Sequence, residues 1–316
     1  MFAAFPLIYI SSVRYNVGMD YPVYKSTFER ISCGAVIDDF EFLYHKLNEI
    51  IAYLGGDFRW LFAITSIIFC VIIYKTIFRD SPMPAISVFL LVATTYYFCF
   101  LNGIRSMLAY AITLFSLKYV EERRFIPFLL AIIIAGGFHA TGYLFVVVYF
   151  IYNKNFSKTF TLITSLCVFV LAPVLGKFVN YLMSMTKYAG YLDSSYADAE
   201  QGYIKLLITV AVVVFSAFYY DKEDKKFQLY YKLQVIYLWL TALVPYVPLI
   251  TRVRWMFGLP IIILVPLTIS KEKNPMSKLL VTYIIVVLYA VYCAYNLIEY
   301  NTNAVLPYQT IFTSNY

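Results

Sequence analysis

Charged residues, histidine and cysteine are all scarce in this sequence. Lys, Arg, Asp and Glu make up 14% of its 316 residues, against about 25% in an ordinary soluble domain. Histidine occurs twice, and the five cysteines include no C-x-x-C pair. These shortages argue against a soluble globular enzyme, a metal site built from His or Cys, and a disulfide-stapled secreted domain. We therefore predict that the chain uses no metal and no cofactor.

Apolar residues take the place of the missing charge. Hydrophobic residues make up 62% of the chain, aromatic residues make up 20%, and the mean hydropathy is +0.73. This composition is typical of a polytopic membrane protein, in which tyrosine collects at the membrane interfaces. The net charge is +7, but the chain has no basic run of the kind that binds nucleic acid. We interpret the charge as a topology signal together with anion binding, and we expect no nucleic-acid partner.

Apolar segments long enough, or nearly so, to cross a bilayer recur along the chain. They are 58–78, 83–101, 104–120, 159–179, 203–220, 229–250, 254–269 and 278–298. The opening run 1–13 would reach only about 20 Å as a helix, so it is either a partial first span or part of a helix that starts upstream. We expect an all-α polytopic membrane protein with about 10 transmembrane or half-membrane helices. It would form a single integral membrane domain over 1–316, with its transmembrane bundle at 58–298.

Residues 125–152 are too long for one upright span, because they would make about 42 Å of helix. They also contain Gly136, Gly137 and Gly142 around His139. If the segment turns back at these glycines, the loops rich in Lys and Arg all fall on one side of the membrane, as the positive-inside rule requires. A single crossing would spread them over both sides. We therefore predict a helical hairpin with His139 at its outer tip, covered by protein or by a watery cavity.

This topology places 14–57, 180–202 and 299–316 at the outer face. In 37–54, apolar residues recur at helical spacing and charged residues occupy the other face, which predicts an amphipathic helix lying in the interface. The outer loop 180–202 is polar and rich in tyrosine, and it is a candidate lid. Its acidic residues are Asp193, Asp198 and Glu200.

Arginine gathers on the outer side of this topology, whereas lysine gathers inside. The outer arginines are Arg14, Arg30, Arg59, Arg105, Arg252 and Arg254. The positive-inside rule does not predict such a split. Because the planar guanidinium fork binds phosphate well, we interpret the outer arginines as an anion site. Charged residues beside broken helices are how membrane proteins build substrate sites at depth.

Each candidate residue also has a structural interpretation. In this interpretation Arg14 and Arg59 snorkel from helix ends, and Arg105, Arg252 and Arg254 form ion pairs with outer acids. His139 is a packed and hydrogen-bonded histidine. Asp20 pairs only with Arg14, and Glu41 belongs to a solvated helix face. At membrane depth the functional interpretation of an ionisable side chain is the default.

Short motifs follow one another over nearly the whole chain. They are Arg14 with Gly18-Met19-Asp20-Tyr21-Pro22-Val23-Tyr24, Glu41 with Leu47-Asn48, Asn102-Gly103-Ile104-Arg105-Ser106-Met107-Leu108-Ala109, Phe138-His139-Ala140-Thr141, Arg252 with Arg254, and Pro307-Tyr308. In this order they resemble the EpsG family of Wzy-like polysaccharide polymerases.

The resemblance implies an inverting glycosyl transfer at the outer face of the bacterial cytoplasmic membrane. The growing glycan would leave one polyprenyl diphosphate and pass to a repeat unit on a second one, without a metal. Arginines would bind the diphosphate, and the catalytic candidates would activate or orient the acceptor hydroxyl. The expected substrate-binding residues are Arg14, Arg105, Arg252, Arg254 and Tyr308, and the expected catalytic residues are His139, Asp20 and Glu41.

Other functions fit parts of the same pattern. A ligase that transfers finished glycan would share the Arg and His chemistry. A flippase or other transporter of lipid-linked oligosaccharide would show polar residues in both halves of the membrane and internal repeats, which we do not find. A membrane acyltransferase would use a histidine but would not need several outer arginines. The expected partners are the lipid-linked donor and acceptor and the membrane lipid, with a chain-length regulator protein as a further candidate.

Overall fold

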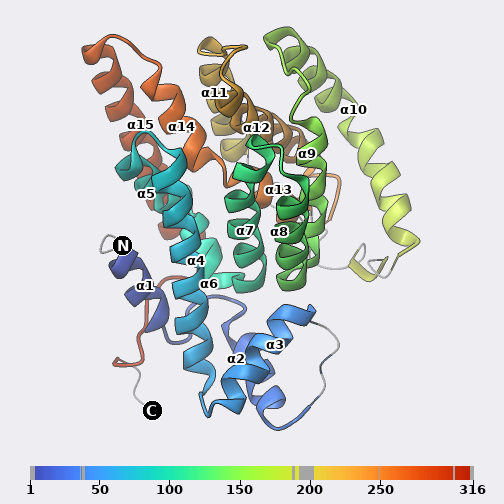
Figure 1. Ribbon diagram of the computed structural model, residues 1–316, viewed down its shortest axis with the longest axis vertical. Coiled ribbons are helices and arrows are strands. Elements are labelled where there is room, and N and C mark those ends of the chain that lie inside the picture. The colour runs from blue at the N-terminus through green and yellow to red at the C-terminus, as the bar shows by residue number, and fades with distance from the viewer. Residues whose placement is uncertain are drawn as a thin grey trace. The chain divides into compact units, whose positions relative to one another are not determined.

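The described residues fold into a series of helices (Figure 1). The computed structural model describes residues 4–35, 37, 40–186, 189–191, 203–248, 250–301 and 303–313. Within these residues the secondary structure is helical, apart from one isolated β-bridge between Arg14 and Thr310. The all-α prediction is therefore confirmed. The chain forms two compact units, Met1–Val146 with Asn274–Tyr316, and Val147–Lys273.

The first unit contains both ends of the described chain. Its elements are α1 (Phe5–Ser12), α2 (Tyr21–Ser32), α3 (Phe42–Tyr53), α4 (Phe58–Asp80), α5 (Pro84–Ala93), α6 (Tyr96–Asn102), α7 (Ile104–Glu121), α8 (Phe125–Phe138), the 3₁₀ helix η2 (Ala140–Val146), α15 (Pro275–Tyr295) and the π-helix η5 (Asn296–Tyr300). Most of α7 is buried, and it packs against α4 and α8. Helices α2 and α3 lie together at one end of the unit, and α3 packs against α8 (Figure 1).

The second unit is also helical. Its elements are α9 (Val147–Ile151), α10 (Lys158–Ser184), the 3₁₀ helix η3 (Ala189–Tyr191), α11 (Tyr203–Phe218), α12 (Lys225–Leu243), α13 (Ile250–Gly258) and α14 (Ile261–Ser270). Most of α12 is buried, and α10, α11, α13 and α14 pack against it. The acidic residues of the predicted lid, Asp193, Asp198 and Glu200, lie outside the described residues.

Four described helical stretches are long and apolar enough to cross a membrane. They are Phe58–Asp80, Lys158–Ser184, Ile250–Ser270 and Pro275–Tyr300. Within the second and fourth, only 11% and 6% of the most apolar window is buried inside the protein, so their side chains are free to meet lipid. Shorter apolar helices accompany them. Together these helices indicate a multi-pass membrane protein.

The predicted span 83–101 is not one straight helix. It consists of α5 and α6, which are bent by 52° relative to each other. The break lies at Thr95, whose φ of +69° is left-handed, a conformation that an L-residue cannot continue as a helix. The segment is therefore a broken span or a re-entrant loop. Its second half, α6, leads directly into Gly103 and the start of α7.

Candidate functional site

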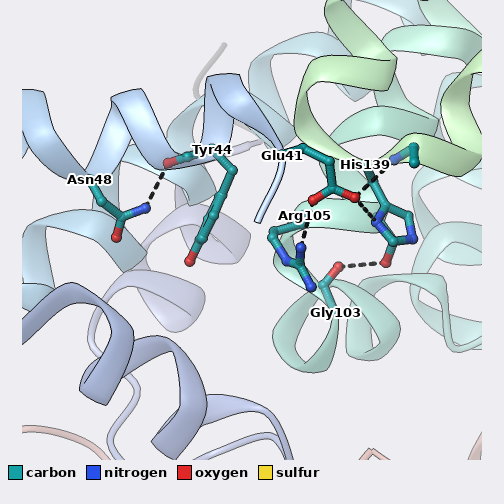
Figure 2. A network of polar contacts seen from close by, with 8 residues as sticks. Glu41, Tyr44, Asn48, Gly103, Arg105 and His139 are labelled. Carbon is teal, nitrogen blue, oxygen red and sulfur yellow. Dashed lines mark hydrogen bonds and ion pairs between the residues drawn. The ribbon is translucent and has the colours of Figure 1, made fainter. Parts of the chain in front are cut away.

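Three segments that are far apart in the sequence meet at the carboxylate of Glu41 (Figure 2). Glu41 precedes α3 and has extended backbone angles. Arg105 is the second residue of α7, two positions after Gly103. His139 ends α8 in an extended conformation, with φ −157° and ψ 125°. Each side chain therefore stands at a helix end, where a polar group is placed without interrupting an apolar helix.

Both oxygens of Glu41 accept hydrogen bonds. Oε2 accepts from Nη1 of Arg105 at 2.6 Å. Oε1 accepts from the backbone N–H of Ala140 at 2.9 Å and lies 3.0 Å from Nδ1 of His139. The carboxylate thus joins a cation, a helix-breaking histidine and the start of η2. Arg105 therefore forms an ion pair with Glu41, whereas the placement of this pair at the outer face stays a prediction.

The same contacts control the charge of Glu41. Burial by itself would raise the pKa of this carboxyl group. The hydrogen bond with His139, the positive charge of Arg105 and the N–H of Ala140 outweigh burial and lower the pKa from 4.5 to about 2. Glu41 is therefore ionised at neutral pH.

Aromatic rings frame the cluster. The Cζ atom of Arg105 lies 4.2 Å from the ring centroid of Phe40 and 5.7 Å from that of Tyr44, so its guanidinium is held by cation–π contacts as well as by Glu41. Tyr110 lies edge-on to the imidazole of His139, with 6.5 Å between ring centroids. The Tyr110 hydroxyl is 3.1 Å from that of Thr141, which ties α7 to η2.

Two glycines allow these elements to approach one another. A Cβ at Gly137 would lie 2.7 Å from the side chain of Leu43 on α3, and a Cβ at Gly142 would lie 2.9 Å from the carbonyl carbon of Ala135 on α8. Neither position has room for a larger residue. Gly142 lets η2 pack back against the end of α8, and Gly137 lets α3 pack beside His139.

Several buried polar atoms around the cluster have no hydrogen-bond partner within the described part of the chain. They are Nε2 of His139, Nε of Arg105, the Tyr44 hydroxyl and Oδ1 of Asn48. The amide of Asn48 donates to the carbonyl of Tyr44 at 2.7 Å. Sequence reasoning did not select Tyr44 as a site residue. The sequence feature that could have indicated Tyr44 is its position three residues after Glu41, which places the two side chains about one helical turn apart.

Arg14 is buried in the same unit, with 1% of its surface exposed. Its Cζ atom lies 4.5 Å from the ring centroid of Phe62 and 5.8 Å from that of Phe100. Nη1 donates to the carbonyl of Ser11 at 3.3 Å, while Nε and Nη2 have no partner in the described residues. Burial lowers the pKa of Arg14 to about 10, so the guanidinium stays charged at neutral pH.

Tyr308 and Asp20 both lie in the first unit. The hydroxyl of Tyr308 donates to the carbonyl of Ile10, and burial raises the pKa of this phenol to about 12. The backbone N–H of Asp20 donates to Oδ1 of Asn102 at 3.0 Å, which links the segment before α2 to the turn before α7. The ring of Tyr24 on α2 lies 5.9 Å from that of Tyr44. Burial raises the pKa of the Tyr24 phenol, and the positive charge of Arg105 opposes this effect. Arg14 and Asp20 lie in the same unit as the Glu41 cluster, and their membership of one site stays a prediction.

Arg252 and Arg254 lie on α13 in the second unit. Arg254 is 2% exposed, and its Cζ atom lies 5.9 Å from the ring centroid of Tyr237 on α12. Its Nε atom has no partner among the described residues. The convergence of these two arginines with Arg105 stays a prediction. Among the described residues, no group of three or more His, Cys, Asp or Glu side chains could hold a metal ion.

Comparison with known proteins gives one family. The family model described as the EpsG family matches residues 1–310. That range includes Glu41, Arg105, His139 and the pair on α13. No curated protein and no solved structure matches the chain.

Proposed function

The chain belongs to the EpsG family, and from this premise we propose that it polymerises lipid-linked oligosaccharide repeat units into a bacterial surface polysaccharide. The family suggests a role in polysaccharide biosynthesis. The observation that carries the finer proposal is the Arg105–Glu41–His139 cluster. The cluster contains an imidazole that can accept a proton and a guanidinium cation. The helices around it indicate a multi-pass membrane protein.

The proposed reaction is an inverting glycosyl transfer. A hydroxyl of the acceptor sugar attacks the anomeric carbon of the donor from the face opposite the polyprenyl diphosphate. The new C–O bond forms as the bond to the diphosphate oxygen breaks, and the electron pair leaves on the diphosphate. The hydroxyl proton needs an acceptor, for which His139 is our candidate. Asp20 is our candidate for orienting the acceptor sugar.

Arginine side chains would stabilise the leaving diphosphate. Guanidinium groups donate paired hydrogen bonds to phosphate oxygens and keep their charge when partly desolvated. We assign this role to Arg252 and Arg254, supported by Arg14, Arg105 and Tyr308. Fixed cations of this kind stabilise charge where it develops in the transition state, so the reaction would not depend on a divalent metal.

The proposed site faces the outer side of the bacterial cytoplasmic membrane. Segment 14–57, with α3 in the interface, would cover the hairpin tip at His139. Single cysteines at 139 and 252 in a cysteine-free variant would react with a membrane-impermeant thiol reagent in intact cells. Labelling of the two positions from opposite sides of the membrane would contradict this placement.

The direct test is reconstitution in vesicles with defined polyprenyl-diphosphate repeat units. A polymerase makes a ladder of longer products from these units alone, and the ladder persists in a metal chelator. A ligase would need a separate acceptor, and a flippase would move the units without joining them. Absence of elongation by the wild-type protein would contradict the proposal, and elongation that stops with chelator would contradict its metal-free form.

A further inference from the structure

The contacts of Glu41 determine where the proton of His139 lies. We propose that Glu41 is a positioning residue: together with Arg105 it holds His139 with its hydrogen on Nδ1, and it leaves Nε2 to accept the proton of the acceptor hydroxyl. The catalytic part of this assignment rests on the proposed function, whereas the tautomer rests on geometry alone.

The assignment starts from the donors around the carboxylate. Arg105 and the backbone N–H of Ala140 can only donate hydrogen bonds, and they contact Oε2 and Oε1 of Glu41 at 2.6 and 2.9 Å. An ionised carboxylate can only accept. The contact of 3.0 Å between Oε1 and Nδ1 of His139 is therefore a hydrogen bond only if Nδ1 carries the hydrogen. In the neutral imidazole, Nε2 is then the atom with the free lone pair.

Nε2 of His139 is left without a partner. It is buried, and no donor contacts it within the described part of the chain. A buried polar atom without a hydrogen bond is uncommon and calls for an explanation. A hydroxyl of a bound sugar would supply the missing donor, and that hydroxyl is the group that must lose its proton in the proposed reaction.

Glu41 itself is poorly suited to be the base. Both of its oxygens are already engaged, by Arg105 on one side and by His139 and Ala140 on the other. Its pKa of about 2 makes it a weak proton acceptor near neutral pH. Its negative charge instead stabilises the imidazolium that forms when His139 takes a proton.

The proton balance of the step is complete. The acceptor hydroxyl gives its proton to Nε2 while its oxygen bonds to the anomeric carbon and the diphosphate leaves with the electron pair of the broken bond. His139 becomes a cation beside ionised Glu41, whose other oxygen stays on Arg105. The proton then passes from Nε2 to water, which restores the neutral imidazole.

Other ionisable side chains lie on the elements packed against α8 and η2. Among the described residues they are Tyr44, His45, Lys46, Glu49 and Tyr53 on α3, Arg105, Tyr110, Lys118, Tyr119 and Glu121 on α7, and Tyr143 on η2. The chain has two histidines. In the second one, His45, Nδ1 lies 3.3 Å from Glu49 on its own helix. His45 and Glu49 therefore provide a matched histidine–carboxylate control outside the cluster.

The first experiment reads the tautomer without any substrate. Full-length His45→Gln protein is labelled with ¹⁵N-histidine and reconstituted in lipid vesicles, so that His139 gives the only imidazole signals. We expect ¹⁵N shifts of an imidazole protonated at Nδ1 at about pH 8. Addition of Glu41→Gln should reduce this preference, whereas addition of Glu49→Gln should leave it unchanged. A signal from the Nε2–H form in the His45→Gln protein would overturn the assignment, even if Glu41 variants fail to fold.

The second experiment follows elongation of lipid-linked repeat units. Glu41→Gln should lower kcat by about 10²-fold with little change in KM for the acceptor. Glu49→Gln and His45→Gln should keep the wild-type kcat.

The two proposals fail in different ways. A kcat of Glu41→Gln equal to that of the wild type would overturn the positioning role, while wild-type elongation would still support the polymerase. Wild-type protein that shows the Nδ1–H form but does not elongate the units would overturn the proposed function and leave the tautomer assignment standing.

Discussion

Two arginines of the first unit are held in different ways. Arg105 lies 2.6 Å from the carboxylate of Glu41, and its side chain keeps 19% of its surface exposed. Arg14 is almost fully buried, and within the described residues its guanidinium contacts the rings of Phe62 and Phe100 and one carbonyl group. The charge of Arg105 is thus matched by a fixed anion, whereas Arg14 is stabilised by π-electron density and by dipoles.

This difference separates two uses of the same side chain. An arginine tied to a carboxylate fixes the geometry of its partner, and its removal would leave that carboxylate uncompensated. An arginine held by aromatic faces keeps its charge unmatched, so an arriving phosphate would gain the full attraction. We therefore propose that Arg105 mainly positions His139. Of the two arginines, Arg14 is the better candidate for binding an anion.

The largest expected effect comes from His139, the residue whose position Arg105 and Glu41 fix. His139→Gln should lower the rate of elongation by about 10³-fold, because no other group of the cluster can take the hydroxyl proton. Product ladders from reconstituted protein measure the rate, and His45→Gln is the matched control. Equal loss of activity in both variants would point to general damage rather than to a base at position 139.

The dependence of stability on pH tests the ionised state of Glu41, which forms an ion pair with Arg105. The folded-state pKa of Glu41, about 2, lies below its ordinary value of 4.5. The stabilisation is therefore present above pH 4.5 and is lost as the pH falls toward 2, with a total of about 2–3 kcal/mol. The Tm difference between wild type and Glu41→Gln should shrink between about pH 5 and pH 2. A difference that stays constant over this range would contradict the depressed pKa.

A double-mutant cycle measures the coupling directly. Arg105→Met and Glu41→Gln should show an interaction energy of about 1–3 kcal/mol in the free energy of unfolding, because the two side chains share an ion pair. Arg14→Met with Glu41→Gln should be additive within about 0.5 kcal/mol, since these two described residues share no hydrogen bond or ion pair. Equal coupling in both cycles would erase the distinction between the arginines.

The smallest expected effect on stability belongs to Arg14 alone. Arg14→Met replaces a buried charge by an apolar side chain, and no acid within the described residues forms an ion pair with Arg14, so the free energy of unfolding should change by no more than about 1 kcal/mol. The KM for the lipid-linked donor should rise if Arg14 serves the diphosphate. A loss of several kcal/mol with an unchanged KM would instead make Arg14 a structural residue.

The sequence predicted most of the helices and the break at His139, but not the break within 83–101. The long spans stand out because their apolar residues are continuous, as in α4, α10 and α15. The bend between α5 and α6 depends on a left-handed Thr95, and threonine gives no sequence signal for that conformation. The amphipathic pattern over 37–54 did predict α3. The helix begins only at Phe42, after the carboxylate of Glu41 has turned toward Arg105 and His139.

The members of the candidate site could be predicted one at a time, but their pairing could not. Glu41, Arg105 and His139 each stood out as polar residues beside an apolar segment. Their contacts span 64 and 98 residues of sequence, and only the packing of α3, α7 and α8 brings them together. The frame formed by Phe40 and Tyr44 was missed because aromatic residues are common throughout the chain.

The surroundings of Arg14 are completed by the far end of the chain. The N–H of Tyr15 donates to the carbonyl of Gln309 at 2.9 Å, and the N–H of Ile311 donates to the carbonyl of Val13 at 2.9 Å. During translation, residues 309–311 leave the ribosome after all the preceding helices have been made. The stretch around Arg14 can therefore form these two hydrogen bonds only after residues 309–311 have been made, and a chain that stops before them would keep its transmembrane helices but lack both bonds.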